Sequence, residues 1–525
     1  MQLIDDESAE PGAEAVGRDS WYRRFDPLVV AVAAVSLVTY VLHGFHGLLT
    51  RDLGVYAYGA RQVLAGEPPY VGIVNRAGPL AHMLPVPGIV AARIVGGNEL
   101  VGMRAWYMVI AVASVVVTYI VARDLFASRT AGLAAAATML SFQGFIDLAT
   151  DGPREKTPMV LFILCAIWAV SHRRWLLTGV SISLATLTLQ VAFLPLLVGA
   201  LVGILLVGPG RRLKDLVRLA IGGAIPVAVL LAYFAAYGAL QDLLDGFLLL
   251  NLRYTHGRGV TARILAVAVA MKEGYGVTLW LMLAGLVLII AIAVVRWLDP
   301  ATRHDPATVT LVVVAVITVG SLLWMEVDFD SWEDAFTVLP LAALGIGAGT
   351  TWLLQHLPQR AAPVVGVLAV ALPTVLAVQY SAATRDDQLV QQQALLKEIL
   401  AEDPGARIWS IEAPQYLVLD RQKAVTRYQL FAQGLRRNID HTWPGGIKAF
   451  VAWNLAQQPD LIALNSDEMK IGHWRHRVEA DYIQVGHGPG AYFFARRSLG
   501  PDVITAMRRA NARIFTRFGC PCPAG

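Results

Sequence analysis

Long apolar runs alternate with short polar segments over roughly the first 380 residues of the chain. Apolar runs of about 18 residues or more recur there, and each is long enough to cross a bilayer as a helix. The pattern predicts about eleven transmembrane helices between residues 25 and 384. One run, 176–207, is too long for one helix, so we expect two short spans with a turn near Gln190.

The segment 50–99 interrupts this pattern, because it is polar and rich in proline and glycine. Pro79 and Pro85 would break a continuous helix there. We expect an outer loop with short helices at the membrane interface, a depth that suits Tyr56. A second mixed segment, 238–273, predicts an amphipathic interfacial helix and a loop.

The pattern changes again at about residue 385. An amphipathic helix is expected over 388–402, and helical patterns near 446–457 and 501–514 alternate with runs typical of strands. Those strand-like runs are 407–411, 460–464, 482–485 and 491–494. Together they predict a small α/β domain over 385–525.

Composition supports a polytopic α-helical membrane protein. The chain is 56% hydrophobic and 16% charged, whereas soluble proteins carry about 25% charged residues. Its formal net charge of +4 does not indicate a nucleic-acid partner, because basic residues ordinarily gather in membrane loops. Residues 1–24 are expected to form a disordered cytoplasmic tail, since Arg23 and Arg24 precede the first span. Residue Asp52 and the C-terminal domain are then extracytoplasmic.

Metal-binding signals are weak. Cys165 lies in an apolar run, and the Cys520-Pro521-Cys522 pair has no further ligands nearby. The carboxylates between Glu326 and Asp334 suit Ca²⁺ or Mg²⁺, although such a run is more often a hydrated loop cap. We assign no metal ligand, and a divalent cation stays open as a cofactor.

The loop after the first span carries the chemistry. It contains Asp52-Leu53-Gly54-Val55-Tyr56, then Gly66-Glu67-Pro68-Pro69-Tyr70, then Gly78-Pro79. In order and spacing it resembles the GT-C class of integral-membrane glycosyltransferases, near the bacterial protein O-mannosyltransferase and aminoarabinose-transferase group (family 39-like). The resemblance covers about residues 25–380. It implies a GT-C-like fold, a sugar donor on a polyprenyl phosphate, and inversion at the anomeric carbon.

The resemblance also implies roles for particular residues. Asp52 would be the general base that deprotonates an acceptor hydroxyl, a poor nucleophile whose attack a positioned carboxylate accelerates about 10²–10⁴-fold. Glu155 would be a second acidic residue of the site. The phosphate of the donor lipid would need cations at the depth of the membrane surface, and this need, rather than a match of single positions to the family, gives the candidates for binding the phosphate or the substrate: Arg76, Arg154, Lys156, Arg253, Tyr254, Arg258 and Lys272. The plainer alternatives are solvated loop charges and, for Asp52, a simple pair with Arg51.

The expected function is transfer of a sugar to a cell-envelope glycan, lipid or protein outside the cytoplasm. A lipid or glycan transporter or flippase is the alternative, but it predicts charged or broken-helix sites near mid-membrane in two similar halves. Here the ionisable residues crowd the outer loops. A scaffold whose outer domain binds a partner is a third hypothesis.

Overall fold

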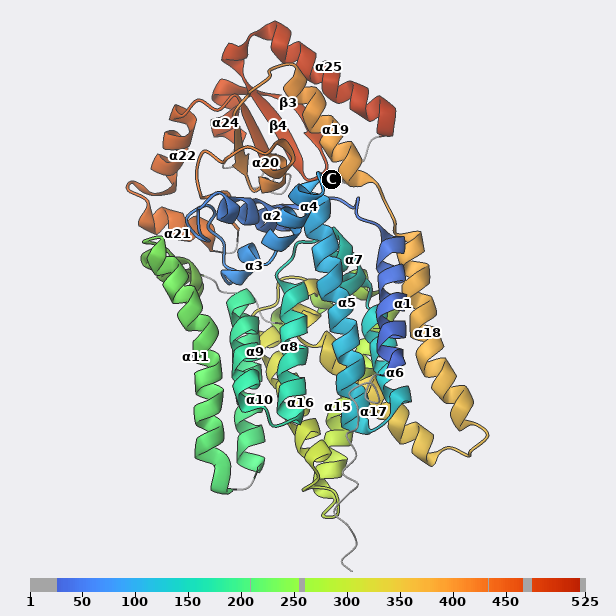
Figure 1. Ribbon diagram of the computed structural model, residues 1–525. Helices are drawn as coiled ribbons and strands as arrows, with labels where there is room; N and C mark the ends of the chain where they lie inside the picture. The colour runs from blue at the N-terminus through green and yellow to red at the C-terminus, as the bar shows by residue number, and fades with distance from the viewer. Residues whose placement is uncertain (1–25, 208, 255–259, 433, 466–474, 520–525) are drawn as a thin grey trace, which may run out of the picture.

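The computed structural model describes residues 26–207, 209–254, 260–432, 434–465 and 475–519. A bundle of apolar helices forms one end of the molecule, and a mixed α/β domain sits on the other end (Figure 1). The expected cytoplasmic tail, 1–24, lies outside the described residues.

The bundle follows the predicted apolar runs closely. Its helices are α1 (Pro27–His43), α5 (Glu99–Phe126), α6 (Arg129–Ser141), α7 (Gln143–Asp151), α8 (Lys156–Ser171), α9 (Trp175–Thr188), α10 (Phe193–Leu206), α11 (Arg212–Ala236), α15 (Thr278–Leu298), α16 (Pro306–Val327), α17 (Leu339–His356) and α18 (Ala362–Ala383). The predicted hairpin is present as α9 and α10, which are joined by a short 3₁₀ turn, η2 (Gln190–Ala192).

Length and composition qualify five helical segments among the described residues to cross a membrane, or six if the bent pair α6–α7 counts as one span. Several further apolar helices are shorter, with 10–17 residues. The polytopic α-helical class is therefore confirmed, whereas the number of spans stays a prediction.

One predicted span is not straight. The run expected over 130–148 breaks at Phe142, and α6 and α7 meet at 67°. Gly144 at the start of α7 packs so closely on Trp332 that a side chain there would overlap the indole ring. The bend turns the C-terminal end of α7, with Asp147 and Asp151, toward the polar end of the bundle.

Close helix packing holds the bundle together where small residues meet. A Cβ atom on Gly345 of α17 would overlap the backbone carbonyl of Gly285 on α15, and a Cβ on Gly285 would overlap that of Ala342. Without the hydrophobic effect of water inside a bilayer, such close backbone approach supplies the van der Waals contact that keeps helices together.

Short elements cover the polar end of the bundle. They are α2 (Arg51–Leu64), α3 (Leu80–Met83), α4 (Val86–Ile94), α12 (Leu240–Leu243), the π-helical η4 (Leu244–Leu249), α13 (Leu250–Tyr254), η5 (Thr261–Arg263), α14 (Ile264–Tyr275) and η6 (Trp332–Thr337). Figure 1 places α2 and α3 between the bundle and the C-terminal domain.

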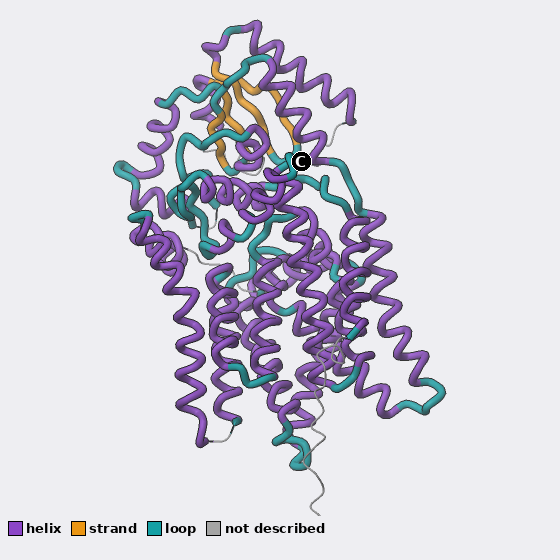
Figure 2. Tube along the Cα trace, viewed as in Figure 1, coloured by secondary structure: helices purple, strands orange, loops and turns teal. Residues whose placement is uncertain are grey.

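In the described part of the C-terminal domain, four strands form one sheet in the order β1-β2-β4-β3 (Figure 2). β1 (Ile408–Ile411) and β2 (Leu461–Asn465) are parallel, whereas β4 (Ala491–Arg496) runs antiparallel to β2 and to β3 (Tyr482–Gly488). The helices are α19 (Gln388–Ala401), α20 (Pro414–Asp420), α21 (Leu435–Thr442), α22 (Gly446–Ala456), α24 (Arg475–Asp481) and α25 (Pro501–Phe518), with the 3₁₀ turn η7 (Arg497–Leu499). All four predicted strands are present.

Candidate active site

Asp52 lies in the first turn of α2, a short helix within the segment 50–99, for which the sequence predicts an outer loop with short helices. The Thr50 hydroxyl caps this helix by accepting a hydrogen bond from the Leu53 amide at 3.4 Å. A carboxylate at a helix N-terminus is stabilised by the helix dipole and by the unpaired amides there. The local sequence therefore fixes Asp52 on a rigid element at the polar end of the bundle.

Two guanidinium groups hold the Asp52 carboxylate. Arg51 Nε lies 2.8 Å from Oδ1, and a terminal nitrogen of Arg154 lies 2.6 Å from Oδ2. Burial disfavours the charged carboxylate, but Arg154 and Arg51 outweigh it and hold the pKa of Asp52 well below its ordinary value. About a third of the side chain, 35%, stays exposed, so an incoming group can reach it.

Arg154 is shared by three carboxylates. Besides Asp52 it faces Glu155, with Nε 3.3 Å from Oε2, and Glu333, with Nη2 3.7 Å from Oε1. Its side chain is only 9% exposed. Burial opposes the charged guanidinium, but Glu155 and Asp52 outweigh it and raise the pKa of Arg154. Arg154 therefore stays a cation in this buried position.

A cavity of about 410 Å³ opens beside Asp52 toward the bundle, and we call it the bundle cavity. Two further cations line it. Arg76 lies 3.2 Å from Asp328 and 3.5 Å from Asp330, and Lys156 lies 2.7 Å from Asp334. The charged residues of its wall are Arg51, Asp52, Arg76, Arg154, Glu155, Lys156, Asp328, Asp330, Glu333 and Asp334.

The backbone of Arg76 is fixed by two amide side chains. Gln190 and Asn251 donate to its carbonyl oxygen at 3.2 and 3.0 Å, and both also donate to the carbonyl of Phe247. Gln190 is a polar residue within a long apolar run, and its side chain is used for these two hydrogen bonds. Together with Asn251 it holds the backbone of Arg76 at the cavity.

The acidic segment 328–334 pairs with these cations. Asp334 also accepts hydrogen bonds from the amides of Asp330 and Ser331, at 2.7 and 3.1 Å, which shapes the turn before η6. Burial opposes its charge, but Lys156 and these amides hold the pKa of Asp334 below its ordinary value. No three His, Cys, Asp or Glu side chains among the described residues converge as metal ligands.

A second cavity, of about 600 Å³, is also lined by Asp52, and we call it the domain cavity. Asp52, Arg51, Arg154, Trp332 and Glu333 line both cavities, so they form the wall between them. The remaining wall of the domain cavity includes His43, Asp147, Asp151, Tyr380 and Asp386 from the bundle side, and Asn465, Pro489 and Gly490 from the C-terminal domain.

The structure brings five of the predicted site residues together at the bundle cavity: Asp52, Glu155, Arg76, Arg154 and Lys156. Arg253, Tyr254 and Lys272 line neither cavity. The Tyr254 ring instead lies 5.5 Å from that of His441, and Lys272 is exposed on α14. Arg258 lies outside the described residues.

Sequence reasoning missed the support from the C-terminal domain. Glu412, only 1% exposed, lies 2.9 Å from Arg51 through Oε2, while its Oε1 accepts from the amides of Phe431 and Ala432. Glu412 therefore anchors the guanidinium that pairs with Asp52. No local pattern around Glu412 signals this contact, because Arg51 is 361 residues away along the chain.

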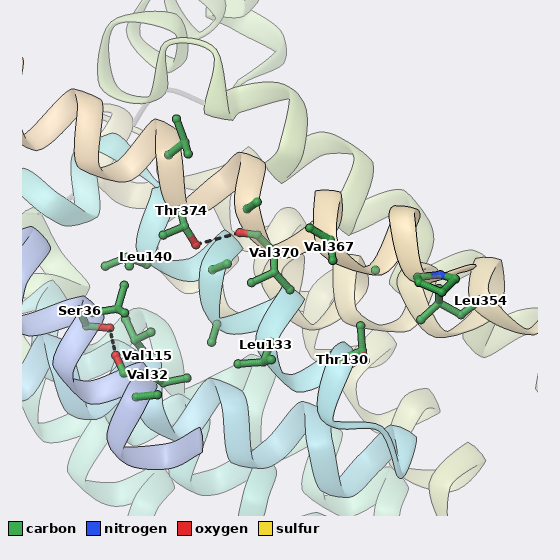
Figure 3. A pocket seen from close by; sticks show the side chains of 18 of the residues that line it. Val32, Ser36, Val115, Thr130, Leu133, Leu140, Leu354, Val367, Val370 and Thr374 are labelled. Atoms are coloured by element: carbon green, nitrogen blue, oxygen red, sulfur yellow. Dashed lines mark hydrogen bonds between the residues drawn. The ribbon is translucent and has the colours of Figure 1, made fainter. Parts of the chain in front are cut away.

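The bundle also contains a larger hollow that is apolar. It measures about 1000 Å³ and lies among α1, α6 and α18 (Figure 3). Two hydroxyls of its wall bond within their own helices, since Ser36 donates to the carbonyl of Val32 and Thr374 to that of Val370, both at 2.8 Å. Without a titratable side chain in its wall, this hollow offers no acid, base or cation for chemistry.

Comparison with solved structures gives the fold. ArnT from Cupriavidus metallidurans superposes with a TM-score of 0.62 in the apo state and 0.60 bound to undecaprenyl phosphate, each with 14% identity over 92% of this chain and 100% of that one. This chain has the GT-C fold. The Archaeoglobus fulgidus oligosaccharyltransferase, in complex with Zn and sulfate, matches with a TM-score of 0.53 and 14% identity over 94% of this chain and 77% of its own. No family model and no curated protein matches the sequence.

Proposed function

We propose that the protein is a glycosyltransferase that moves a sugar from a polyprenyl-phosphate donor to a hydroxyl of an extracytoplasmic acceptor, with Asp52 as general base. The observation that carries the proposal is the position of Asp52, which is ionised, partly exposed and at the wall of a cavity lined by Arg76, Arg154 and Lys156. The likeness to GT-C structures, one of them with undecaprenyl phosphate bound, supports it.

The bond changes follow from this placement. The acceptor oxygen forms a bond to the anomeric carbon of the donor, and its proton passes to the Asp52 carboxylate. The bond between the anomeric carbon and the phosphate oxygen breaks, and the electron pair leaves with the lipid phosphate. A single displacement needs one base and inverts the anomeric centre.

The leaving phosphate needs cations near the membrane surface. Arg76 and Lys156 come from different elements and face the same cavity as Arg154. Charge-assisted hydrogen bonds from guanidinium and ammonium groups are strong and suit phosphate oxygens. The carboxylates of Asp328, Asp330 and Asp334 already bind Arg76 and Lys156. A donor phosphate would therefore replace these carboxylates as the partner of Arg76 and Lys156. Binding of the donor would then require no further burial of the two cations.

Arg154 links the phosphate to the base. In the free enzyme it lies 2.6 Å from Asp52 and depresses the pKa of that carboxylate, which makes it a weak base. A phosphate in the bundle cavity competes for the same guanidinium. As Arg154 turns toward the phosphate, Asp52 gains basicity, so donor binding prepares the proton transfer.

An apolar groove beside the bundle cavity suits the lipid part of the donor. It measures about 560 Å³, and its wall combines α9, α10, α11 and the η4 segment, including Leu187, Leu230 and Phe247. The carbonyl of Phe247 shares the Gln190 and Asn251 amides with that of Arg76. The groove and the cation-lined cavity are thus neighbours, as a molecule with an isoprenoid chain and a phosphate requires.

The test is transfer by the Asp52→Asn variant. Purified full-length protein in lipid nanodiscs is given a panel of radiolabelled polyprenyl-phosphate hexoses and pentoses, with an envelope extract as acceptor. We expect transfer to fall about 10²–10⁴-fold, as for loss of a general base, while donor binding persists. Asp387→Asn, which removes a nearby exposed carboxylate, is the matched control.

Full transfer by Asp52→Asn would contradict the assignment of the base. Lipid translocation that is insensitive to this change, without sugar transfer by the wild type, would favour the transporter hypothesis. Equal losses in Asp52→Asn and Asp387→Asn would point to a folding defect, which thermal unfolding of each variant detects separately.

A further inference from the structure

The domain cavity differs from the bundle cavity in the charges that lie away from their shared wall. In the bundle cavity these are the cations Arg76 and Lys156 together with the carboxylates of Glu155, Asp328, Asp330 and Asp334. Among the described lining residues of the domain cavity, the groups beyond the shared wall that can carry charge near neutral pH are the carboxylates of Asp147, Asp151 and Asp386 and the imidazole of His43, which lies 3.3 Å from Asp147. Its only Arg or Lys side chains in this set belong to the shared wall, where Asp52 and Glu333 already pair with them.

This distribution decides which substrate each cavity can hold. A phosphate in the domain cavity would face the carboxylates of Asp147, Asp151 and Asp386, and among the described lining residues no Arg or Lys beyond the shared wall would offset the repulsion between like charges. A phosphate in the bundle cavity finds Arg76 and Lys156. In an inverting displacement the nucleophile and the leaving phosphate lie on opposite sides of the anomeric carbon, so the acceptor needs a place of its own, and the domain cavity also reaches Asp52.

The lining of the domain cavity suits a sugar. Carboxylate oxygens accept strong hydrogen bonds from hydroxyl groups, and Trp332 offers an aromatic surface for the apolar face of a ring. A volume of about 600 Å³ is within the range of small-molecule sites, roughly 300–1000 Å³. The C-terminal domain supplies Asn465, Pro489 and Gly490, so it takes part in the choice of acceptor.

We infer that the domain cavity is the acceptor site and that it takes a glycan end that is uncharged or amine-bearing, and rejects one that carries a phosphate or carboxylate near the reacting hydroxyl. The assignment of this cavity as the acceptor site rests on the proposed function. The charge selectivity of the cavity itself can be measured without any transfer.

Binding of three sugars with the same ring tests the selectivity. Methyl glucoside, methyl glucosaminide and glucose 6-phosphate are titrated into the full-length protein in nanodiscs of neutral lipid that contain saturating polyprenyl phosphate, so that the bundle cavity is occupied, with saturation-transfer NMR as the readout. We expect the neutral and amine-bearing sugars to bind at least about tenfold more tightly than the phosphate, because carboxylates surround the cavity. Asp386→Asn should reduce the ratio between the dissociation constant of glucose 6-phosphate and that of methyl glucoside about threefold or more, since it removes one of these charges.

Asp387→Asn is the matched control, because it removes the same charge one residue away, on an exposed side chain that does not line the cavity. Equal or tighter binding of glucose 6-phosphate overturns the inference, as does an identical response of the two variants. Binding of a neutral serine- or threonine-containing peptide in preference to all three sugars also overturns it. Selective binding without any sugar transfer would support the charge selectivity of the domain cavity and contradict only the proposed glycosyltransferase reaction.

Discussion

The bundle cavity and the domain cavity share a wall at Asp52 but differ in how their charges are balanced. In the bundle cavity, Arg76 and Lys156 each pair with carboxylates of the segment 328–334. In the domain cavity, the described residues away from the shared wall include the carboxylates of Asp147, Asp151 and Asp386 but no Arg or Lys. Under the proposed function, Asp52 would serve an anionic donor in the bundle cavity and a non-anionic acceptor in the domain cavity.

Arg154 belongs to both cavities, so changing it should have the largest effect in this comparison. Arg154→Gln removes the cation that contacts Asp52, Glu155 and Glu333. We expect a loss of about 10²-fold or more in kcat/KM, because a buried charge-assisted contact to both base and phosphate is gone. Steady-state kinetics in nanodiscs measure this. Arg154→Lys keeps the positive charge but not the two-pronged guanidinium, so it should recover part of the loss. Activity of Arg154→Gln close to that of the wild type would contradict a role for Arg154 in both cavities.

Lys156 lines the bundle cavity and not the domain cavity, so a change at this residue tests the bundle cavity alone. Lys156→Met should raise the KM for the donor about tenfold and change kcat and the acceptor KM little, because one phosphate contact is lost from binding. Titration of each substrate at saturating levels of the other distinguishes these effects. Lys272→Met is the matched control, because that exposed side chain lines neither cavity. An increase in the acceptor KM instead would reverse the assignment of the two cavities.

Glu412 tests whether the C-terminal domain contributes to the base as well as to the domain cavity. Glu412→Gln keeps the shape but removes the charge that holds Arg51. We expect kcat to fall about three- to tenfold with the donor KM unchanged, a loss smaller than that of a residue in direct contact with substrate. Glu402→Gln, which alters a surface pair with Arg513 in the same domain, is the control. Equal losses of kcat in Glu412→Gln and Glu402→Gln would show that Glu412 has only a structural role.

The smallest expected effect is that of pH on kcat/KM. Arg51 and Arg154 hold the pKa of Asp52 below its ordinary value, so this carboxylate stays ionised in the free enzyme when the pH falls from 9 to 5. The value of kcat/KM should therefore vary by less than about twofold between pH 5 and 7 on account of Asp52. A tenfold fall per pH unit within this window, measured at constant ionic strength, would show that the reactive base titrates near neutrality.

Most of the fold could be predicted from the sequence because apolar periodicity is local. The helix runs, the 176–207 hairpin and all four strands of the C-terminal domain have positions within a few residues of those expected. The bend at Phe142 could not, because it depends on packing of Gly144 against Trp332, a residue almost 190 positions away.

The site was predictable to the extent that it lies in the polar loops around the spans. Asp52, Arg76, Glu155, Arg154 and Lys156 follow apolar runs or lie between them, and the structure brings them to one cavity. The pairing of Arg51 with Glu412 and the acidic wall of the domain cavity depend on contacts across hundreds of residues. The carboxylates of 328–334 were visible as a run, but their partners Arg76 and Lys156 were not.

The most direct test of the central claim is a map of the full-length protein with a bound polyprenyl phosphate. The account predicts phosphate density in the bundle cavity, within hydrogen-bonding distance of Arg76, Lys156 or Arg154 and on the opposite side of Asp52 from Asp147 and Asp386. Phosphate density in the domain cavity, or only at the far end of the bundle near Arg212, would contradict it.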